Sequence, residues 1–525
     1  MKVSFERVCY LIVYFSNALS NIIYFLLSIS YFMEKINELY YNAYNYLEEG
    51  KTKEAISILN ELKKMERNIN LDQCIGGLLI DIGYEIDNID FIEEGITIFT
   101  NIIKVNNNSV MKYNLANGYF SKYKLKKSLF LNLEDKTLYD AKKLYKESLK
   151  EEKLIKAMIN LANIYDVSGR FIESLYYYNQ ILELEPNNVY VLINKGITLC
   201  NYDRLMNNPS FILFDAYNCF EKSLKQSKIT LKQKQSAEKG IKYVENYIDL
   251  DKEYIHSPLI LNQKNDFESF LDNFCLRHKL YLNLCTFCQK CSNARGDTIA
   301  IKNMIDVISE NFEESIVLKL NSYLNQIKMD FISTRFLIAL SECYDIDFDF
   351  IDKNAHLVET YQYEDNGIRT QLLKNAFNNL FNILDKISYF MNDYLELGIK
   401  YSNVSFRKIW FNKGNINKGI NEKLRVLDNK GITALFDIYR DFEKDGEYNY
   451  LKYMRNLLTH RYLKITHFKV NQKNKSYDEF LKDTLKLAGI VRNSIIYLIN
   501  LVNINENLKS KQYGNDLPKI NIYQN

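Results

Sequence analysis

A short stretch of the chain, Lys452 to Tyr462, combines residue types that can hold and cleave a phosphodiester. Arg455 carries a guanidinium that can bind a phosphate through two parallel hydrogen bonds and neutralise charge in a transition state. His460, one of only five histidines, can take up and return a proton near neutral pH. The pattern favours phosphodiester chemistry, with Arg455, His460 and Asn456 as candidate catalytic residues and Arg461 as a supporting one.

The region around this stretch is strongly basic, although the whole chain is nearly neutral. The 525 residues carry a net charge of +3, but Lys400 to Lys475 contain 17 Lys or Arg against 7 Asp or Glu. This local excess of +10 leaves −7 for the remainder. A basic segment around the candidate site suits a polyanionic substrate such as RNA. A solvated helix surface is the alternative interpretation.

The elements that position these residues are predicted to be long helices. Only four prolines and few glycines occur, which argues against a β-sandwich or a disordered chain. The strongest helix is predicted at Thr370 to Leu397, with Asp385 beside its apolar stripe. The residues of that stripe recur at three and four positions: Leu373, Phe377, Leu380, Phe381, Leu384, Ile387, Ser388, Met391 and Leu395.

The spacing of Arg455 and His460 on a helix has a geometric consequence. Residues five apart on a regular helix point about 140° away from one another. The two side chains therefore cannot easily act on one phosphate unless the helix is broken or a second chain contributes. A symmetric dimer, which pairs the motif of one chain with that of its mate, meets this requirement.

The Arg-Asn-x-x-x-His motif that begins at Arg455 resembles the signature of the HEPN superfamily. HEPN domains are α-helical, and many of them are metal-independent ribonucleases. Further agreement comes from Lys374 to Tyr394, which looks like the long helix of one HEPN branch, and from Ser405 to Trp410. That branch also joins its HEPN domain to N-terminal tetratricopeptide-like repeats. The resemblance spans roughly Asn273 to Leu501.

This resemblance implies a four- to five-helix bundle that dimerises and brings two motifs together across a cleft. It also implies cleavage of RNA through the ribose 2′-hydroxyl, with no cofactor and no metal. His460 would act as the base and Arg455 would neutralise the phosphate. Asn456 would orient the phosphate or fix the helix end, and Asp385 would hold Arg455 or set the histidine tautomer. The alternative is that Arg455 and His460 only cap and salt-bridge one end of a bundle.

The first half of the chain contains degenerate repeats about 34 residues long, which resemble tetratricopeptide repeats. About five copies cover Glu38 to Gln226. Small residues at fixed positions let paired helices approach closely, and such an array offers a concave face to partners. The clearest frames are Ala43, Tyr46, Gly50, Ala55 and Leu59; Gly83, Ile86, Gly95 and Phe99; and Ala162, Tyr165, Gly169, Ser174, Tyr178 and Pro186.

The predicted fold is therefore all-α, a tetratricopeptide-like helical solenoid followed by a HEPN-type four- to five-helix bundle. The predicted domains are an apolar N-terminal segment (1–37), the repeats (38–250), the HEPN domain (260–505) and a polar tail (506–525).

The function predicted is that of an endoribonuclease effector of a toxin or anti-phage defence kind, with the repeats sensing or restraining it. Expected partners are an RNA substrate, a second copy bound through the HEPN domain, and a protein or peptide in the repeat groove. Because the repeats carry no histidine, we expect them to regulate and not to catalyse. Deleting residues 1–250 should then leave cleavage intact, or raise it if the repeats are inhibitory. The alternative is a non-catalytic adaptor that dimerises through its HEPN domain.

An apolar run near the N-terminus bears on localisation. Val8 to Met33 carries no charge and is long enough to cross a bilayer, but serines and asparagines interrupt it. The favoured interpretation is an extra helix or an extension ahead of a start at Met33, which leaves the protein cytoplasmic. The alternative is a membrane tether through residues 8–33, which makes the protein a membrane-anchored signalling scaffold.

The nine cysteines are too sparse for a disulfide scaffold and are odd in number, which favours a reducing compartment. Several of them cluster with a histidine and offer the ligand types of a zinc site. Their half-sites lie closer together than in a usual zinc ribbon, so buried or incidental thiols are the favoured interpretation. The cluster is Cys275, His278, Cys285, Cys288 and Cys291.

Overall fold

The computed structural model describes most of the chain. The described residues are 31–126, 133, 135–202, 210–252, 260, 266–284, 294–301, 304–305, 316–356, 358, 363–469, 474–513 and 519–520. The apolar segment predicted at 8–33 and the expected tether lie almost wholly outside them.

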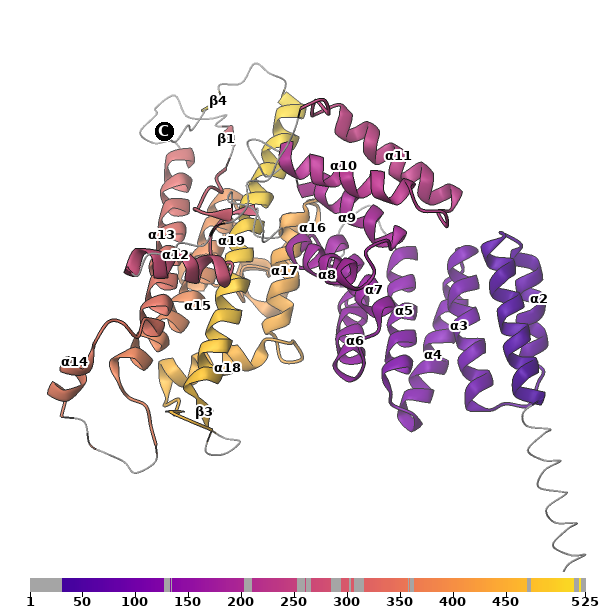
Figure 1. Ribbon diagram of the computed structural model, residues 1–525, viewed down its shortest axis with the longest axis horizontal. Helices are drawn as coiled ribbons and strands as arrows, with labels where there is room; N and C mark the ends of the chain where they lie inside the picture. The colour runs from indigo at the N-terminus through magenta and orange to yellow at the C-terminus, as the bar shows by residue number, and fades with distance from the viewer. Residues whose placement is uncertain are drawn as a thin grey trace, which may run out of the picture. The chain divides into compact units, whose positions relative to one another are not determined.

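The described residues are overwhelmingly helical, which confirms the all-α prediction (Figure 1). Residues 31–48 form a first helix. The helices of the repeat region are α2 (Thr52–Leu62), α3 (Ile69–Glu85), α4 (Ile89–Val105), α5 (Ser109–Leu125), α6 (Thr137–Glu151), α7 (Ile155–Val167), α8 (Phe171–Leu184), α9 (Val189–Tyr202), α10 (Ser210–Leu224) and α11 (Leu231–Glu245).

The later helices are longer on average and are separated by irregular segments. They are α12 (Phe267–Arg277), α13 (Ile316–Glu342), α14 (Asp349–Asn354), α15 (Ile368–Tyr394), α16 (Glu422–Arg425), α17 (Lys430–Phe442), α18 (Asn449–His460) and α19 (Tyr477–Tyr513), with 3₁₀ turns η5 (Tyr401–Asn403), η6 (Asn412–Gly414) and η7 (Ile416–Lys418). Among the described residues, four two-residue strands form two small pairs. Antiparallel β1 (Met304–Ile305) pairs with β4 (Lys519–Ile520), and parallel β2 (Ile465–Thr466) pairs with β3 (Lys475–Ser476).

The chain divides into two compact units. The first comprises Met1–Ser128 and Asp135–Met158, and the second comprises Leu129–Glu134 and Ile159–Asn525. This division falls within the predicted repeat array (38–250), so the later repeats belong to the same unit as the C-terminal helices.

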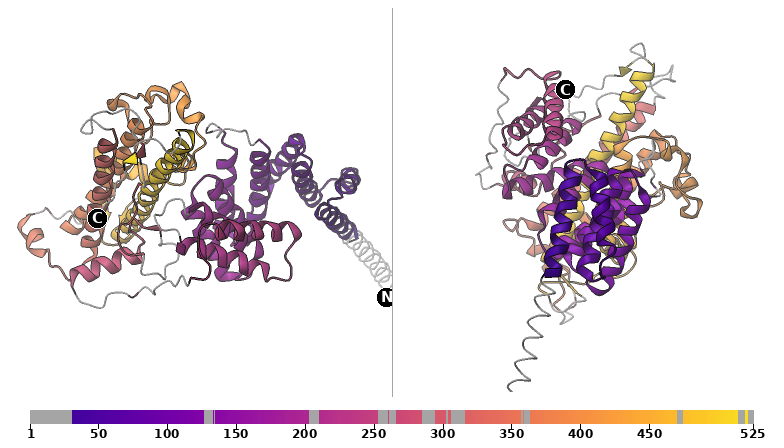
Figure 2. Two further views of the ribbon diagram at one scale, coloured as in Figure 1. Left: turned by 90° about the horizontal axis from the view of Figure 1, so that it is seen from above. Right: turned by 90° about the vertical axis from the view of Figure 1, so that its right-hand side faces the viewer.

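The first unit is a stack of helical hairpins in which each helix packs on the next one along the chain (Figure 2). Small residues make the close contacts that the repeat frame predicts. A Cβ atom on Gly95 would lie only 2.8 Å from the carbonyl oxygen of Gly76, so α3 and α4 meet at backbone distance. Gly50 turns the chain between the first two helices at φ +74, a conformation that glycine adopts without steric cost.

Tyrosines serve the repeats in two ways. Tyr145 and Tyr178 are completely buried in the helix stack, whereas Tyr41 and Tyr44 are 65% and 43% exposed. Tyrosine is therefore a core residue at some repeat positions and a surface residue at others, which the sequence alone did not separate.

In the second unit, α13, α15, α17, α18 and α19 form a bundle in which α15 contacts α13, α18 and α19 (Figure 1). The predicted apolar stripe of α15 forms the centre of this bundle. Leu373, Phe377, Leu380, Ile387 and Met391 are all completely buried. Periodicity therefore located both the helix and the face that it buries.

Helix α19 is the one described helix that is long and apolar enough to cross a membrane, over Tyr477–Ser510. The apolar window in it is 83% buried within the protein, as expected for the core helix of a bundle. The helix continues to Tyr513, so the polar tail predicted at 506–525 begins inside it. Glu506 is buried there and accepts a hydrogen bond of 2.7 Å from the Tyr394 hydroxyl.

Candidate functional site

Helix α18 carries the Arg…His motif and ends on its histidine. Its buried face is made by Leu451 and Met454, which pack into the bundle core. The chain leaves the helix at Arg461, whose amide still donates to the carbonyl of Leu457. His460 is thus the last helical residue, and its side chain is exposed.

Arg455 lies half-buried on the side of α18 that faces α15. Its guanidinium carbon lies 6.0 Å from the centroid of the Phe381 ring, at the limit of a cation–π contact. Its charge also acts on Asp385, one turn along α15 from Phe381. Among the described residues Arg455 donates no hydrogen bond, so its planar fork is available to a ligand.

Asp385 is held by the backbone of a distant segment. Its Oδ1 accepts a hydrogen bond of 2.8 Å from the amide of Phe406. Burial raises the pKa of Asp385 above its usual range, while the Phe406 amide and the positive charge of Arg455 oppose the increase. Asp385 therefore fixes the start of the Ser405–Trp410 segment and faces Arg455 at the same time.

These residues line one cavity of about 290 Å³. Its apolar wall includes Phe381 and Phe442, and its polar lining includes Asp385, Arg455 and Asn456. An arginine over an apolar wall interacts more strongly with a phosphate than it would in open water, because the local dielectric constant is lower.

Glu443, at the rim of this cavity, pairs with the other two cations that line it. Its Oε1 lies 3.0 Å from Nζ of Lys452 and 3.2 Å from Nε of Arg407. Both cations are therefore already ion-paired, whereas no described carboxylate lies within 4.0 Å of the Arg455 guanidinium. Sequence reasoning missed Glu443, because its partners lie 9 and 36 residues away and no local spacing links them. Arg407 lies inside the Ser405–Trp410 segment that supports the family resemblance, and that position was the available signal.

The structure brings together three of the five predicted site residues. Asp385, Arg455 and Asn456 share the cavity, whereas His460 and Arg461 lie beyond it at the exposed end of α18. This separation agrees with the helical geometry, which points Arg455 and His460 about 140° apart. Within one chain, the candidate base does not face the candidate arginine.

Part of the predicted cysteine cluster lies outside the described residues, namely Cys285, Cys288 and Cys291. Cys275 is buried in the core, and burial raises the pKa of its thiol to about 11. The ring of His278 packs against Phe274 at 4.5 Å, and burial lowers the pKa of this histidine. No group of three or more metal-ligating side chains gathers among the residues that the structure describes.

Comparison with known families identifies the bundle. Residues 313–505 match the family model described as LA2681-like HEPN. The chain carries an LA2681-like HEPN domain. The matched range contains α13 to α18, most of α19 and the five predicted catalytic and supporting residues. Helix α12 precedes the match, although the sequence placed the start of the HEPN domain at residue 260, and it packs against α13.

No curated protein matches the chain. Among solved structures, the crystal structure of the P58(IPK) TPR domain matches 41% of this chain at 13% identity and a TM-score of 0.18. The chain spans 66% of that structure, just under two thirds of its length. At this TM-score the likeness carries no argument about how the repeats of this chain are arranged or what they bind.

Proposed function

We propose that the protein is a metal-independent endoribonuclease whose site is built around Arg455 in the HEPN domain. The observation that supports this most is that two of the three cations in the cavity are ion-paired and the third is not. Lys452 and Arg407 are paired with Glu443, whereas the fork of Arg455 donates no hydrogen bond to any described residue. A half-buried arginine whose guanidinium donors are unused can bind a phosphate through two hydrogen bonds.

The reaction is a transesterification within the RNA strand. A histidine removes the proton of a ribose 2′-hydroxyl, and the 2′-oxygen attacks the adjacent phosphorus. The bond from phosphorus to the 5′-oxygen breaks, and that oxygen takes up a proton. Arg455 neutralises the non-bridging oxygens while the charge grows. The products are a 2′,3′-cyclic phosphate and a 5′-hydroxyl, and DNA is not a substrate because it lacks the 2′-hydroxyl.

We further propose that the base comes from a second copy of the chain. His460 is exposed and lies outside the cavity that holds Arg455. A symmetric dimer formed through the HEPN domain would place His460 of one copy beside Arg455 of the other.

The repeats are proposed to bind a protein or peptide that controls cleavage, as in a toxin or an anti-phage defence effector acting in the cytoplasm. The exposed tyrosines Tyr41 and Tyr44 support a binding role for the first unit. A non-catalytic adaptor is the competing function, and the RNA measurements below separate the two.

The first expected result is RNA cleavage that persists in excess EDTA. The proposed chemistry uses a guanidinium and an imidazole, so chelation should leave the rate unchanged within about twofold, far less than the 10²-fold or more that loss of a catalytic group costs. The measurement is denaturing electrophoresis of a labelled RNA, with the new ends assigned by phosphatase and kinase treatment. Cleavage that disappears on chelation and returns with Mg²⁺ would refute the mechanism.

A second expected result tests whether two copies share one site. Arg455→Ala and His460→Ala chains should each be inactive alone, because each lacks one of the two groups. Mixing them should restore activity, because one of the two sites in a mixed dimer has both side chains intact. Two His460→Ala preparations mixed in the same way are the control. Full activity in a strictly monomeric protein would contradict the shared site.

A further inference from the structure

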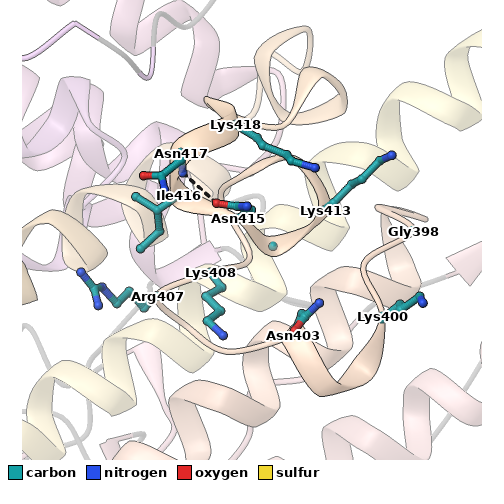
Figure 3. Close-up of a pocket in the computed structure, with 11 residues that line it drawn as sticks. Gly398, Lys400, Asn403, Arg407, Lys408, Lys413, Asn415, Ile416, Asn417 and Lys418 are labelled. Carbon is teal, nitrogen blue, oxygen red and sulfur yellow. Dashed lines mark hydrogen bonds between the residues drawn. The ribbon is translucent and has the colours of Figure 1, made fainter.

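A second, larger pocket opens beside the Arg455 cavity, and its lining is cationic. It has a volume of about 940 Å³ and is formed by residues between Gly398 and Lys418. Figure 3 shows Lys400, Lys408, Lys413 and Lys418 placed around one opening. None of the described residues that line this pocket is acidic. The volume is at the upper end of the roughly 300–1,000 Å³ typical of ligand pockets, so a nucleotide unit fits.

The segment that forms the pocket is irregular, but hydrogen bonds hold it in place. The side chain of Asn392 in α15 binds both the amide and the carbonyl of Ile399. The indole of buried Trp410 donates to the carbonyl of Phe406 at 2.8 Å, and the side chain of Asn412 donates to the carbonyl of Ile420 at 3.2 Å. A ligand would therefore meet a preformed surface and would pay little ordering entropy on binding.

The pocket lysines have no acidic partner in the part of the chain that the structure describes. Among the described residues, no carboxylate lies within 4.0 Å of Nζ of Lys400, Lys408, Lys413 or Lys418, although other lysines of the HEPN domain, such as Lys452 and Lys475, are paired. Lys413 also adopts a left-handed backbone at φ +54, which is costly for a residue with a side chain. Four uncompensated charges around one opening attract a polyanion.

Arg407 joins this pocket to the candidate site. It lines the lysine pocket and also the cavity that contains Arg455. The amide side chains of Asn403 and Asn415 add hydrogen-bond donors between the lysines (Figure 3). The two pockets therefore adjoin at Arg407, which places a group of unpaired cations next to the cavity of the proposed reacting phosphate.

We propose that the lysine pocket binds the phosphates of single-stranded RNA next to the phosphate held by Arg455. This inference rests on the proposed function and specifies its substrate as a strand that reaches several nucleotides past the cleaved bond. Lysines that contact phosphates supply affinity without reading sequence, and release of counterions makes that affinity depend on salt.

The test compares two variants that lose the same charge. One carries Lys400→Gln, Lys408→Gln, Lys413→Gln and Lys418→Gln. The control carries Lys228→Gln, Lys232→Gln, Lys239→Gln and Lys242→Gln, which replace exposed repeat-region lysines that pair with no described carboxylate. Binding of a 12-nucleotide single-stranded RNA with 2′-O-methyl groups throughout is measured by fluorescence anisotropy at several KCl concentrations. This RNA cannot be cleaved, so binding is measured independently of catalysis.

The pocket variant should bind roughly 10- to 100-fold more weakly at low salt, and its log–log salt slope should fall by about 2 to 3, since each phosphate contact contributes about 0.7 on single strands. The control should keep the wild-type affinity and slope, and both variants should keep the wild-type circular dichroism. A pocket variant that binds like wild type would overturn the inference even if the protein cleaves RNA. Binding that is lost in the variant supports it even if no cleavage is found. ATP that competes as well as the oligonucleotide would also overturn it, because the pocket would then serve a mononucleotide.

Discussion

Replacing His460 by alanine is expected to lower the rate of RNA cleavage by about 10²- to 10⁴-fold, the usual cost of losing a general base. The side chain is exposed and ends a helix whose packing depends on Leu451 and Met454. Thermal unfolding should therefore be unchanged, which separates loss of chemistry from loss of fold. The measurement is single-turnover cleavage of a labelled RNA with enzyme in excess.

A matched histidine variant controls for this result. His356 is also exposed and lies in the HEPN domain, but it is outside the Arg455 cavity. His356→Asn suits its left-handed backbone (φ 49), which asparagine tolerates better than most residues. This control should cleave at the wild-type rate. Equal activity in the His460→Ala variant would remove His460 from the site, whereas no cleavage by the wild type would favour the adaptor function.

Replacing Arg170 by methionine is expected to destabilise the second unit by about 3–5 kcal/mol, the usual cost of removing one partner of a buried ion pair. Arg170 is completely buried at the start of α8. Its Nη1 donates to Asp437 at 2.9 Å and to Asp441 at 2.6 Å, both on α17 of the HEPN domain. The Nε and Nη2 atoms of the same guanidinium donate to Glu173. Methionine would fill part of the space but would leave these carboxylates without the charge that faces them.

The single tryptophan of the chain makes this measurement specific. Trp410 is buried in the HEPN domain, with ring contacts to Phe436 and Tyr439 of α17. Urea unfolding followed by its fluorescence therefore reports on the helix that receives Arg170. We expect a lower midpoint for the variant than for wild type.

Two further variants test the electrostatic cause. Adding Asp437→Asn and Asp441→Asn to Arg170→Met should recover part of the lost stability, because the buried carboxylate charges are then removed as well. Lys225→Met breaks an exposed ion pair with Glu221 and should leave the urea midpoint unchanged, because water screens such a pair. An Arg170→Met variant as stable as wild type would show that this buried pair does not hold α8 to α17.

The contacts of Arg170 also change how the repeats should be separated from the HEPN domain. Gly169, at φ +80, comes so close to α17 that a Cβ atom there would lie 2.1 Å from the carbonyl oxygen of Lys430. The ring of Phe171 packs edge-on against Tyr497 of α19 at 5.1 Å. Deleting residues 1–250 would remove these groups from a shared core. Loss of cleavage in that deletion would therefore not show that the repeats take part in catalysis. A deletion that ends near residue 158 would instead follow the boundary between the two compact units.

The sequence determined the parts of this protein that depend on local periodicity. The stripe from Leu373 to Met391 located α15 and its buried face, because the 3.6-residue period decides which side of a helix is apolar. Small residues such as Gly95 indicated where repeat helices meet. The Arg…His motif that begins at Arg455 predicted the family of the C-terminal domain, which the match over residues 313–505 confirms.

Only the tertiary structure decided which distant groups meet. Glu443 pairs with Arg407 across 36 residues, the Phe406 amide reaches Asp385, and Arg170 binds α17 across some 270 positions. A local pattern states that a face is buried or charged, but it does not state against what, since that choice depends on how all the helices pack together. For the same reason the sequence could not show that Arg455 lies in a cavity while His460 lies outside it, or that four lysines of an irregular segment surround one opening.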